Sequence, residues 1–306
     1  MRNMRNIALA AAIVVLTSGS TWGASWRPIN TGLPSAVAGA GGLAIDPATP
    51  STLYSWTIGG ALFQSTDGAG TWKTISGVAA VYWLVVDPKN SSTIYAGASG
   101  RLVKSTNGGA SWAGVNTDGG SVNSLVIDPQ DSNTLYAVSN GRILKSTNGG
   151  SNWNAANTTL PAPENSQPSF LTVDPVTPST LYAVGGRGDI FKTTNGAGSW
   201  VAIKTNPFSG GFAESVLSLA VNPVTPSTIY AGSFAAATAF DAGQGSISRS
   251  TDGGQTWNAI RAGIPTDAFV RSLAIDPASP SNVYAAYGVS GSPASSRARM
   301  EGKAGP

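Results

Sequence analysis

The sequence predicts an all-β protein, a β-propeller of four-stranded antiparallel blades, on three observations. The 306 residues include 38 Gly and 19 Pro, with 41% hydrophobic but only 11% charged residues, a composition typical of short strands separated by tight turns. After the first 25 residues, no run of ten or more has a helical apolar period. Two short phrases also recur at intervals of about one blade, as in repeat architectures.

The first phrase, Leu-x-Ile/Val-Asp/Asn-Pro, leads each time into Ser-Thr-Leu-Tyr or a close variant. We expect it to form the first strand of each blade, along the central channel. The Asp-Pro turn then ends the strand where proline costs no ladder hydrogen bond. The six copies begin at Leu43, Leu84, Leu125, Leu171, Leu219 and Leu273.

The second phrase is Ser/Thr-Thr-Asp/Asn-Gly followed by three residues and Trp, and its five copies end at Trp72, Trp112, Trp153, Trp200 and Trp257. The Trp-to-Trp spacings of 40, 41, 47 and 57 residues leave room for four short strands with loops that lengthen along the chain. We expect the Asp or Asn to accept backbone N–H groups, the Gly to permit positive φ, and the Trp to pack under the turn.

This pattern resembles the Asp-box, or BNR repeat, of sialidases, xyloglucanase-type glycosidases, sortilin-type receptors and photosystem II assembly factors. The resemblance covers nearly all of the chain from Trp26 to Tyr287. It implies that the box turns join the third and fourth strands, on the face away from the ligand site. It also implies that ligands bind where loops join blade to blade and second strand to third.

Residues 1–24 have the layout of a secretory signal peptide. Basic Arg2 and Arg5 precede a short apolar stretch from Ile7 to Leu16, and small residues follow. An uncleaved anchor is the alternative, although ten apolar residues fall short of the ~20 needed to span a bilayer. We therefore predict a secreted or periplasmic protein with no transmembrane anchor after cleavage, and a propeller over residues 25–290.

The two ends of the propeller are expected to meet in one blade, because Trp26-Arg-Pro-Ile-Asn-Thr-Gly-Leu-Pro matches the strand that follows Trp257. About six blades result, the last incomplete, since the pattern dissolves after Tyr287 into an aberrant tail, residues 291–306. Codons chosen for Pro293 to Pro306 can be read in another frame as Gly-Val-Phe-Lys-Ser-Thr-Asp-Gly-Gly-Gln-Gly-Trp, a third strand with a complete box. We therefore interpret the tail as frameshifted.

The chain contains neither Cys nor His. This excludes disulfides, Cys or His metal sites and Ser-His-Asp chemistry, and we expect no metal and no cofactor. The net charge of +3 comes from basic residues at the two ends, and the remaining body is close to neutral. A nucleic-acid partner is therefore not expected.

Function is expected in residues that depart from the repeat. Trp56, Tyr82 and Trp83 come from neighbouring loops and form a candidate stacking platform for sugar rings or a peptide; the alternative is that they fill gaps around small residues. Four arginines form a candidate basic ring that would hold a carboxylate, unless they are solvated loop ends paired with nearby acids. They are Arg101, Arg142, Arg187 and Arg271, the last preceding an inner strand.

The leading interpretation is a non-enzymatic binding or scaffolding propeller that recognises an extracellular peptide, protein or glycan through its loop face. The alternative is a glycoside hydrolase of sialidase or xyloglucanase type, with Glu214 and either Asp189 or Tyr82 as candidate catalytic residues. A third possibility is that the frameshifted chain has no function.

The sialidase motif Phe/Tyr-Arg-Ile-Pro, which the hydrolase alternative would require for a sialidase, is missing. The other acids outside the repeat are Asp118, Glu164, Asp241 and Asp267.

Overall fold

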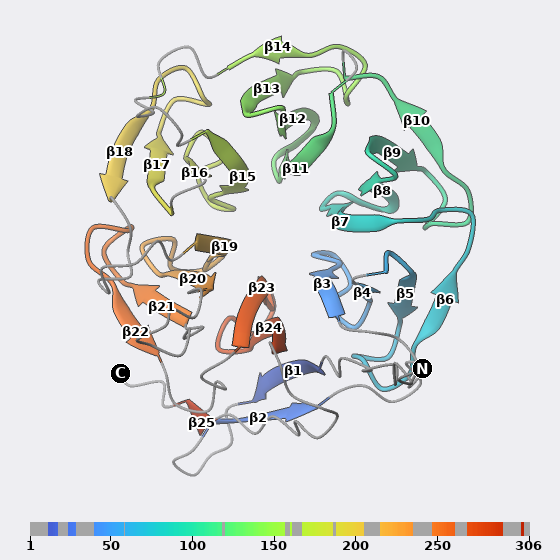
Figure 1. Ribbon diagram of the computed structural model, residues 1–306, viewed down its shortest axis with the longest axis horizontal. Coiled ribbons are helices and arrows are strands. Elements are labelled where there is room, and N and C mark those ends of the chain that lie inside the picture. The colour runs from blue at the N-terminus through green and yellow to red at the C-terminus, as the bar shows by residue number, and fades with distance from the viewer. Residues whose placement is uncertain are drawn as a thin grey trace, which may run out of the picture.

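The chain forms a ring of six antiparallel sheets around a central channel (Figure 1). This computed structural model describes residues 12–17, 24–28, 40–57, 59–117, 120–156, 160, 167–185, 188–204, 215–234, 247–260, 268–289 and 301–302. Five sheets are four-stranded blades whose strands follow the chain from the channel outward, and a sixth is assembled from both ends of the chain. The predicted four-stranded propeller is thus confirmed as five complete blades and an incomplete sixth.

The blades are bounded as follows. Blade 1 holds β3 (Ala40–Ile45), β4 (Leu53–Thr57), β5 (Leu62–Ser65) and β6 (Lys73–Ile75), and blade 2 holds β7 (Val81–Asp87), β8 (Asn90–Ala98), β9 (Arg101–Ser105) and β10 (Ala113–Val115). Blade 3 holds β11 (Val122–Asp128), β12 (Asp131–Ser139), β13 (Arg142–Ser146) and β14 (Asn154–Ala155). Blade 4 holds β15 (Pro168–Val173), β16 (Leu181–Gly185), β17 (Ile190–Thr193) and β18 (Val201–Lys204). Blade 5 holds β19 (Ser215–Val221), β20 (Ile229–Phe234), β21 (Ile247–Ser250) and β22 (Asn258–Ile260).

Burial falls from the second strand of each blade toward its outer edge. Every residue of β4 and of β16 is buried, because these strands are covered by the neighbouring blades on both faces. The outer strands β6, β10 and β22 have two exposed residues followed by one that is half-buried. The core therefore lies between the blades, where aliphatic residues of adjacent sheets pack together.

The turn between the third and fourth strands is closed by its own side chains, as the sequence predicts. In blade 1, the Ser65 hydroxyl donates to Asp67 at 2.7 Å and accepts the N–H of Ala69 at 2.9 Å. Asp67 also accepts the N–H of Thr71 at 2.8 Å, and Gly68 has a φ of 69°. The same bonds to Asn or Asp recur at Asn107, Asn148, Asn195 and Asp252.

The tryptophan after each turn packs beneath it. Trp72 and Trp200 are buried, with 6% and 4% of their surface exposed. The indole N–H of Trp112 donates to the carbonyl oxygen of Gly109 at 3.0 Å, and that of Trp257 donates to Gly254 at 2.9 Å. The indole thus fixes the turn by an apolar contact and, in these two blades, by a hydrogen bond.

The repeated tyrosines join one blade to the next. The Tyr95 hydroxyl of blade 2 donates to the carbonyl oxygen of Gly149, in the turn of blade 3. Lys104 lies opposite Tyr95 on the adjacent strand, with its Nζ 4.9 Å from the ring centroid. Such a cation held over a ring is attracted by the ring's negative face. Blades 2, 3 and 4 each contain such a Tyr–Lys pair, and in blade 2 the tyrosine reaches the turn of the blade that follows.

The sixth sheet closes the ring in the order β23-β24-β1-β2-β25. The Ser272 hydroxyl of β23 donates to the carbonyl oxygen of Leu43 in blade 1 at 3.2 Å, which joins the last inner strand to the first. As expected from the match to the strand after Trp257, the strand with Trp26 belongs to this sheet. The bounds are β23 (Ala268–Ile275), β24 (Val283–Val289), β1 (Ala12–Thr17), β2 (Ala24–Pro28) and β25 (Glu301–Gly302).

The third-strand position of this sheet is taken by β1, which belongs to the segment predicted as a signal peptide. It pairs with β24 on one side and with β2 on the other. Of the tail 291–306, only β25 falls within the described residues. In the part of the chain that the structure describes, no helix is long and apolar enough to cross a membrane.

Candidate functional site on the loop face

Every inner strand carries a register break near its start, at the end of the channel opposite the Asp-Pro turns. Such β-bulges redirect a side chain and are common beside functional sites. In each blade the extra residue stands two positions before the Leu of the repeated phrase. The bulge residues are Gly41, Tyr82, Asn123, Ser169, Leu217 and Arg271.

The strands include residues that the sequence predicted in loops, and Trp56 lies within β4. Tyr82 and Trp83 lie within β7, and Arg271 lies within β23, whereas the sequence placed all three before their inner strands. The strands start earlier because the bulge lets pairing continue past the repeated phrase. Asn123 and Ser169 were not recognised as equivalents of Tyr82, although their constant offset from the repeated Leu was available in the sequence.

The hairpins between second and third strands interlock with the starts of the inner strands to form a continuous loop face. The N–H of Val81 in blade 2 donates to the carbonyl oxygen of Gly60 in blade 1 at 3.1 Å. The Ser121 hydroxyl at the start of blade 3 donates to Gly100 of the blade 2 hairpin at 3.3 Å. Hydrogen bonds of this kind hold neighbouring loops at fixed positions, so that side chains on them form one surface.

Tyr82 is an exposed aromatic residue on this surface, with 41% of its area accessible. Partial burial raises its pKa, and a hydrogen bond with the backbone of Gly100 acts in the opposite direction. This contact places the phenol beside Arg101, the next residue along the hairpin. The ring is therefore anchored at its polar end while part of its surface remains open for stacking.

Arg101 and Arg142 occupy equivalent places in consecutive blades, as the sequence predicts. Each is the first residue of a third strand, paired with Ala98 and Ser139 respectively, and each is exposed. The structure therefore places two guanidinium-bearing residues on the loop face of blades 2 and 3. Arg187 lies outside the described residues, and of Arg271 the structure describes only the backbone.

Trp56 and Trp83 lie against glycines rather than on the open surface. Trp56 is 6% exposed and stands opposite Gly42, where a methyl group would be 2.0 Å from its ring. Trp83 stands opposite Gly97 in the same way, and its Nε1–H donates to the carbonyl oxygen of Val122 in blade 3 at 2.6 Å. This geometry favours the interpretation that both indoles fill gaps around glycines. The two tryptophans thus differ from Tyr82, which is exposed.

The candidate catalytic residues are only partly described. Asp189 lies directly before β17 in the hairpin of blade 4 and is 8% exposed. Glu214 lies outside the described residues, as do the other acids considered, Asp118, Glu164, Asp241 and Asp267. The pairs Glu214–Asp189 and Glu214–Tyr82 are therefore not placed by the structure.

Charge is unevenly distributed between the two ends of the channel. Among the residues whose side chains the structure describes, Asp189 is the one carboxylate at the loop-face end. The others stand in the turns at the opposite end, where their oxygens are used locally. Asp46, for example, accepts the backbone N–H groups of Ala48 and Thr49 at 2.9 and 3.2 Å. Within the described residues, the loop face therefore favours an anionic ligand.

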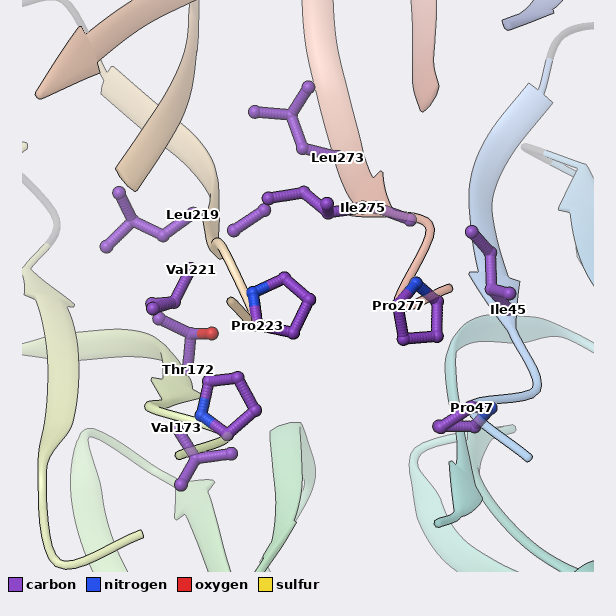
Figure 2. A pocket seen from close by; sticks show the side chains of 13 residues that line it. Ile45, Pro47, Thr172, Val173, Leu219, Val221, Pro223, Leu273, Ile275 and Pro277 are labelled. Carbon is purple, nitrogen blue, oxygen red and sulfur yellow. The ribbon is translucent and has the colours of Figure 1, made fainter. Parts of the chain in front are cut away.

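A cavity of about 270 Å³ occupies the other mouth of the channel (Figure 2). Its wall is almost entirely aliphatic, with Thr172 contributing a hydroxyl, and the prolines of three Asp-Pro turns and one Asn-Pro turn surround it. Those prolines are Pro47, Pro175, Pro223 and Pro277. This cavity can accept an apolar group, but its lining offers neither an acid nor a base for catalysis. Within the described residues, no group of acidic side chains could hold a metal ion.

The family profile of the DUF6242 beta propeller domain matches residues 85–294. A search of curated proteins found no match. Among solved structures, the GH74 enzyme of Niastella koreensis is similar, with 22% identity, a TM-score of 0.63, and coverage of 93% of this chain and 52% of that one. This chain thus spans about half the length of that enzyme.

Two further solved structures are similar. The GH74 xyloglucanase of Xanthomonas campestris has 18% identity and a TM-score of 0.61, with 93% of this chain and 52% of that chain covered. YCF48 of Cyanidioschyzon merolae has 14% identity and a TM-score of 0.52, with 81% of this chain and 94% of that chain covered. At these identities the likeness shows the propeller fold, which hosts both hydrolases and binding proteins.

Proposed function

The chain belongs to the DUF6242 beta propeller domain family, and we propose that it is an exported, non-enzymatic binding propeller. Its loop face recognises an extracellular peptide, protein or glycan that carries a carboxylate. The blades serve as the rigid scaffold, and their third-to-fourth-strand turns are Asp-boxes. The bonds of Ser65 and Asp67 in blade 1, repeated in four more blades, support this assignment of the turns.

The observation that carries the proposal is that Tyr82, Arg101 and Arg142 all lie on the loop face. All three are exposed, and they stand on blades 2 and 3, which are joined by the hydrogen bond from the Ser121 hydroxyl to the carbonyl oxygen of Gly100. A guanidinium binds a carboxylate through paired N–H groups, and a phenol ring stacks against a sugar or an aliphatic side chain. Together they suit a ligand with one anionic group beside a flat or apolar surface.

The test measures binding of ligand pairs that differ by a single carboxylate. The probes are sialyllactose with lactose, and an octapeptide with a free or an amidated C-terminus, each titrated into the full chain by calorimetry. We expect the carboxylated member of at least one pair to bind more tightly. Replacing both arginines, Arg101→Gln with Arg142→Gln, should weaken that binding about tenfold, the effect of losing a charge-assisted hydrogen bond.

Lys73→Gln is the matched control, because Lys73 is an exposed cation that follows the Asp-box turn at the opposite end. It should leave binding unchanged. Equal loss in the control and the double variant would show that the effect comes from net charge and would reject a loop-face site. The proposal is also rejected if no carboxylated probe binds better than its neutral partner.

A glycoside hydrolase remains the second candidate, supported by the likeness to two GH74 enzymes. It predicts turnover of xyloglucan or of an aryl glycoside by the full chain, abolished by Glu214→Gln while the fold persists. The binding propeller predicts no turnover of either substrate and tight retention of the carboxylated probe. Measured together, hydrolysis and binding separate the two functions.

A further inference from the structure

The turns between first and second strands are of two kinds, although each spans eight residues from its Asp or Asn to the repeated Tyr. In blades 2 and 3 the turn is tight, since Asp87 pairs with Asn90 and Asp128 pairs with Asp131. In blades 1, 4 and 5 and in the sixth sheet, a second proline follows the first by three residues, and the second strand begins later. Proline has no N–H for the ladder, so these turns widen into loops.

Each widened loop is held in place by its own polar groups. Asp174 accepts the N–H groups of Val176 and Thr177 at 2.9 and 3.0 Å, and its own N–H donates to the carbonyl oxygen of Thr180 at 2.9 Å. The same bonds recur at Asp46, Asn222 and Asp276. The proline after each of these four residues lines the cavity of about 270 Å³. The widened loops therefore form a fixed rim around it.

The inner strands divide in the same way. The residue between the Leu and the Ile or Val of the repeated phrase is Val85 in blade 2 and Val126 in blade 3. In blades 4 and 5 and the sixth sheet it is Thr172, Ala220 and Ala274, and all three line the cavity. The lining residues come from blades 1, 4 and 5 and the sixth sheet. The cavity thus lies beside widened loops and small inner-strand residues.

The lining determines what the cavity can hold. Its side chains are aliphatic except for the hydroxyl of Thr172, and none is aromatic or charged. A charged group would lose its hydration there without a counter-ion, and a sugar would find no ring to stack on and few partners for its hydroxyls. An alkyl chain needs none of these. At ~30 Å³ each, about nine groups the size of a water molecule or a methylene fill 270 Å³.

The surroundings of the cavity argue against two other occupants. A stable protein interface buries about 800 Å² per partner around an apolar centre. Among the described residues of these turns, the large apolar side chains that are exposed are Val176 and Val224, which do not make such a centre. The described acids of the turns are Asp46, Asp87, Asp128, Asp131, Asp174 and Asp276. Lys89 is the single cation described there, so an anionic head group would be repelled.

We propose that this cavity is a binding site for the alkyl chain of an uncharged amphiphile, of which a medium-length aliphatic alcohol is the simplest case. The prolines Pro47, Pro223 and Pro277 stand around the space on separate loops (Figure 2). Small residues at 220 and 274 leave room for the chain behind them. The site lies at the end of the channel opposite the loop face, so it is independent of the proposed function.

The test compares straight-chain alcohols of four, six, eight, ten and twelve carbons, with the full chain titrated into each by calorimetry. We expect the association constant to rise about fourfold with each added methylene while the alkyl chain fits the cavity. It should level off once the cavity is full, because further methylenes extend into water. Non-specific adsorption to the protein surface would show no such limit.

A double variant locates the site. Ala220→Val with Ala274→Val fills the cavity with the residue that blades 2 and 3 carry at the same position, and should weaken 1-octanol binding at least tenfold. Ala113→Val is the matched control, because Ala113 is exposed on the outer strand β10 and should leave binding unchanged. If the double variant does not fold, the series of chain lengths in the unaltered protein still decides.

Octanoate tests the sign of the head group. It is measured in the chain with Arg101→Gln and Arg142→Gln, so that the loop face does not contribute, and should bind more weakly than 1-octanol. The proposal is overturned if 1-octanol does not bind, if affinity rises without limit along the series, or if the folded double variant binds as well as the control. Tighter binding of octanoate overturns the uncharged head group. Binding of acetyl-Gly-Leu-Gly-amide in place of 1-octanol overturns the alkyl ligand in favour of a protein side chain.

Discussion

The indole of Trp83 rests against Gly97, its partner on the adjacent strand of blade 2. A methyl group on Gly97 would lie 2.1 Å from Nε1 of Trp83, so the absence of a side chain at Gly97 makes room for the ring. From that position the indole donates to Val122 of blade 3. One glycine thus permits a contact that joins two blades.

The substitution Gly97→Ala should therefore destabilise the protein by about 1–3 kcal/mol, the usual cost of overpacking. Gly114→Ala is the matched control, since Gly114 is also in a strand of blade 2 but a methyl group there would meet no atom within 4 Å. Equilibrium denaturation in guanidinium measures both variants. Trp83→Leu combined with Gly97→Ala should recover part of the loss. Equal stability of the two alanine variants would contradict the role of the ring.

The Tyr–Lys pairs predict a second effect on the contact between blades. Lys145 lies 5.2 Å from the centroid of the Tyr136 ring and donates to Gly196 of blade 4. Lys145→Met keeps the aliphatic stem but loses the charge, and should cost about 0.5–2 kcal/mol in the free energy of unfolding. Lys73→Met is the comparison, because Lys73 is exposed on an outer strand. A loss at Lys73 equal to that at Lys145 would reject the contribution of the pair.

The repeats made the fold predictable from the sequence. Each copy of Leu-x-Ile/Val-Asp/Asn-Pro marks an inner strand, and each copy of Ser/Thr-Thr-Asp/Asn-Gly marks a turn closed by its own side chains. The third strand of the sixth sheet was not predictable in this way, since β1 has neither the Lys nor the turn of the repeat. Its position depends on two unpaired strands, β24 and β2, meeting across the ring.

The candidate site was predictable only in part. The equivalence of Arg101 and Arg142 followed from their common place before the third-strand phrase, and both are exposed as a ligand site requires. Whether a tryptophan is open or buried depends on the residue opposite it. The pairing of Trp56 with Gly42 is set by the bulge at Gly41, which shifts the register of β3 by one residue. A linear sequence shows the glycines but not which one faces the ring.

The tryptophans beneath the turns allow a matched comparison. Trp153 and Trp257 hold equivalent places and are both half-buried, but Nε1 of Trp257 donates to Gly254 whereas Nε1 of Trp153 is buried without an acceptor among the described residues. Trp153→Phe should therefore cost about 1 kcal/mol less than Trp257→Phe, because it removes an unsatisfied donor. Urea denaturation of the two variants measures the difference. A larger loss for Trp153→Phe would contradict the hydrogen-bond assignment.

The acidic turns predict how stability falls at low pH. The hydroxyl and the N–H of Thr71 and the hydroxyl of Ser65 hold the pKa of Asp67 at about 2, below its ordinary value of 3.8. Because the folded pKa is the lower one, the stabilisation is complete above pH 4 and is lost as the pH falls from about 4 to about 2. Asp252 has its pKa lowered in the same way, chiefly by Thr256.

Replacing Asp67 with the residue found in blades 2 to 4, Asp67→Asn, should keep the N–H acceptor and make the melting temperature less dependent on pH in this range. The reciprocal change Asn107→Asp places a carboxylate at the equivalent position of blade 2, where Ser111 donates its N–H to the side-chain oxygen at 2.8 Å. It should make the dependence steeper. Melting curves recorded from pH 2 to pH 6 test both variants. Parallel curves for the two variants and the unaltered chain would show that these turns do not couple proton binding to folding.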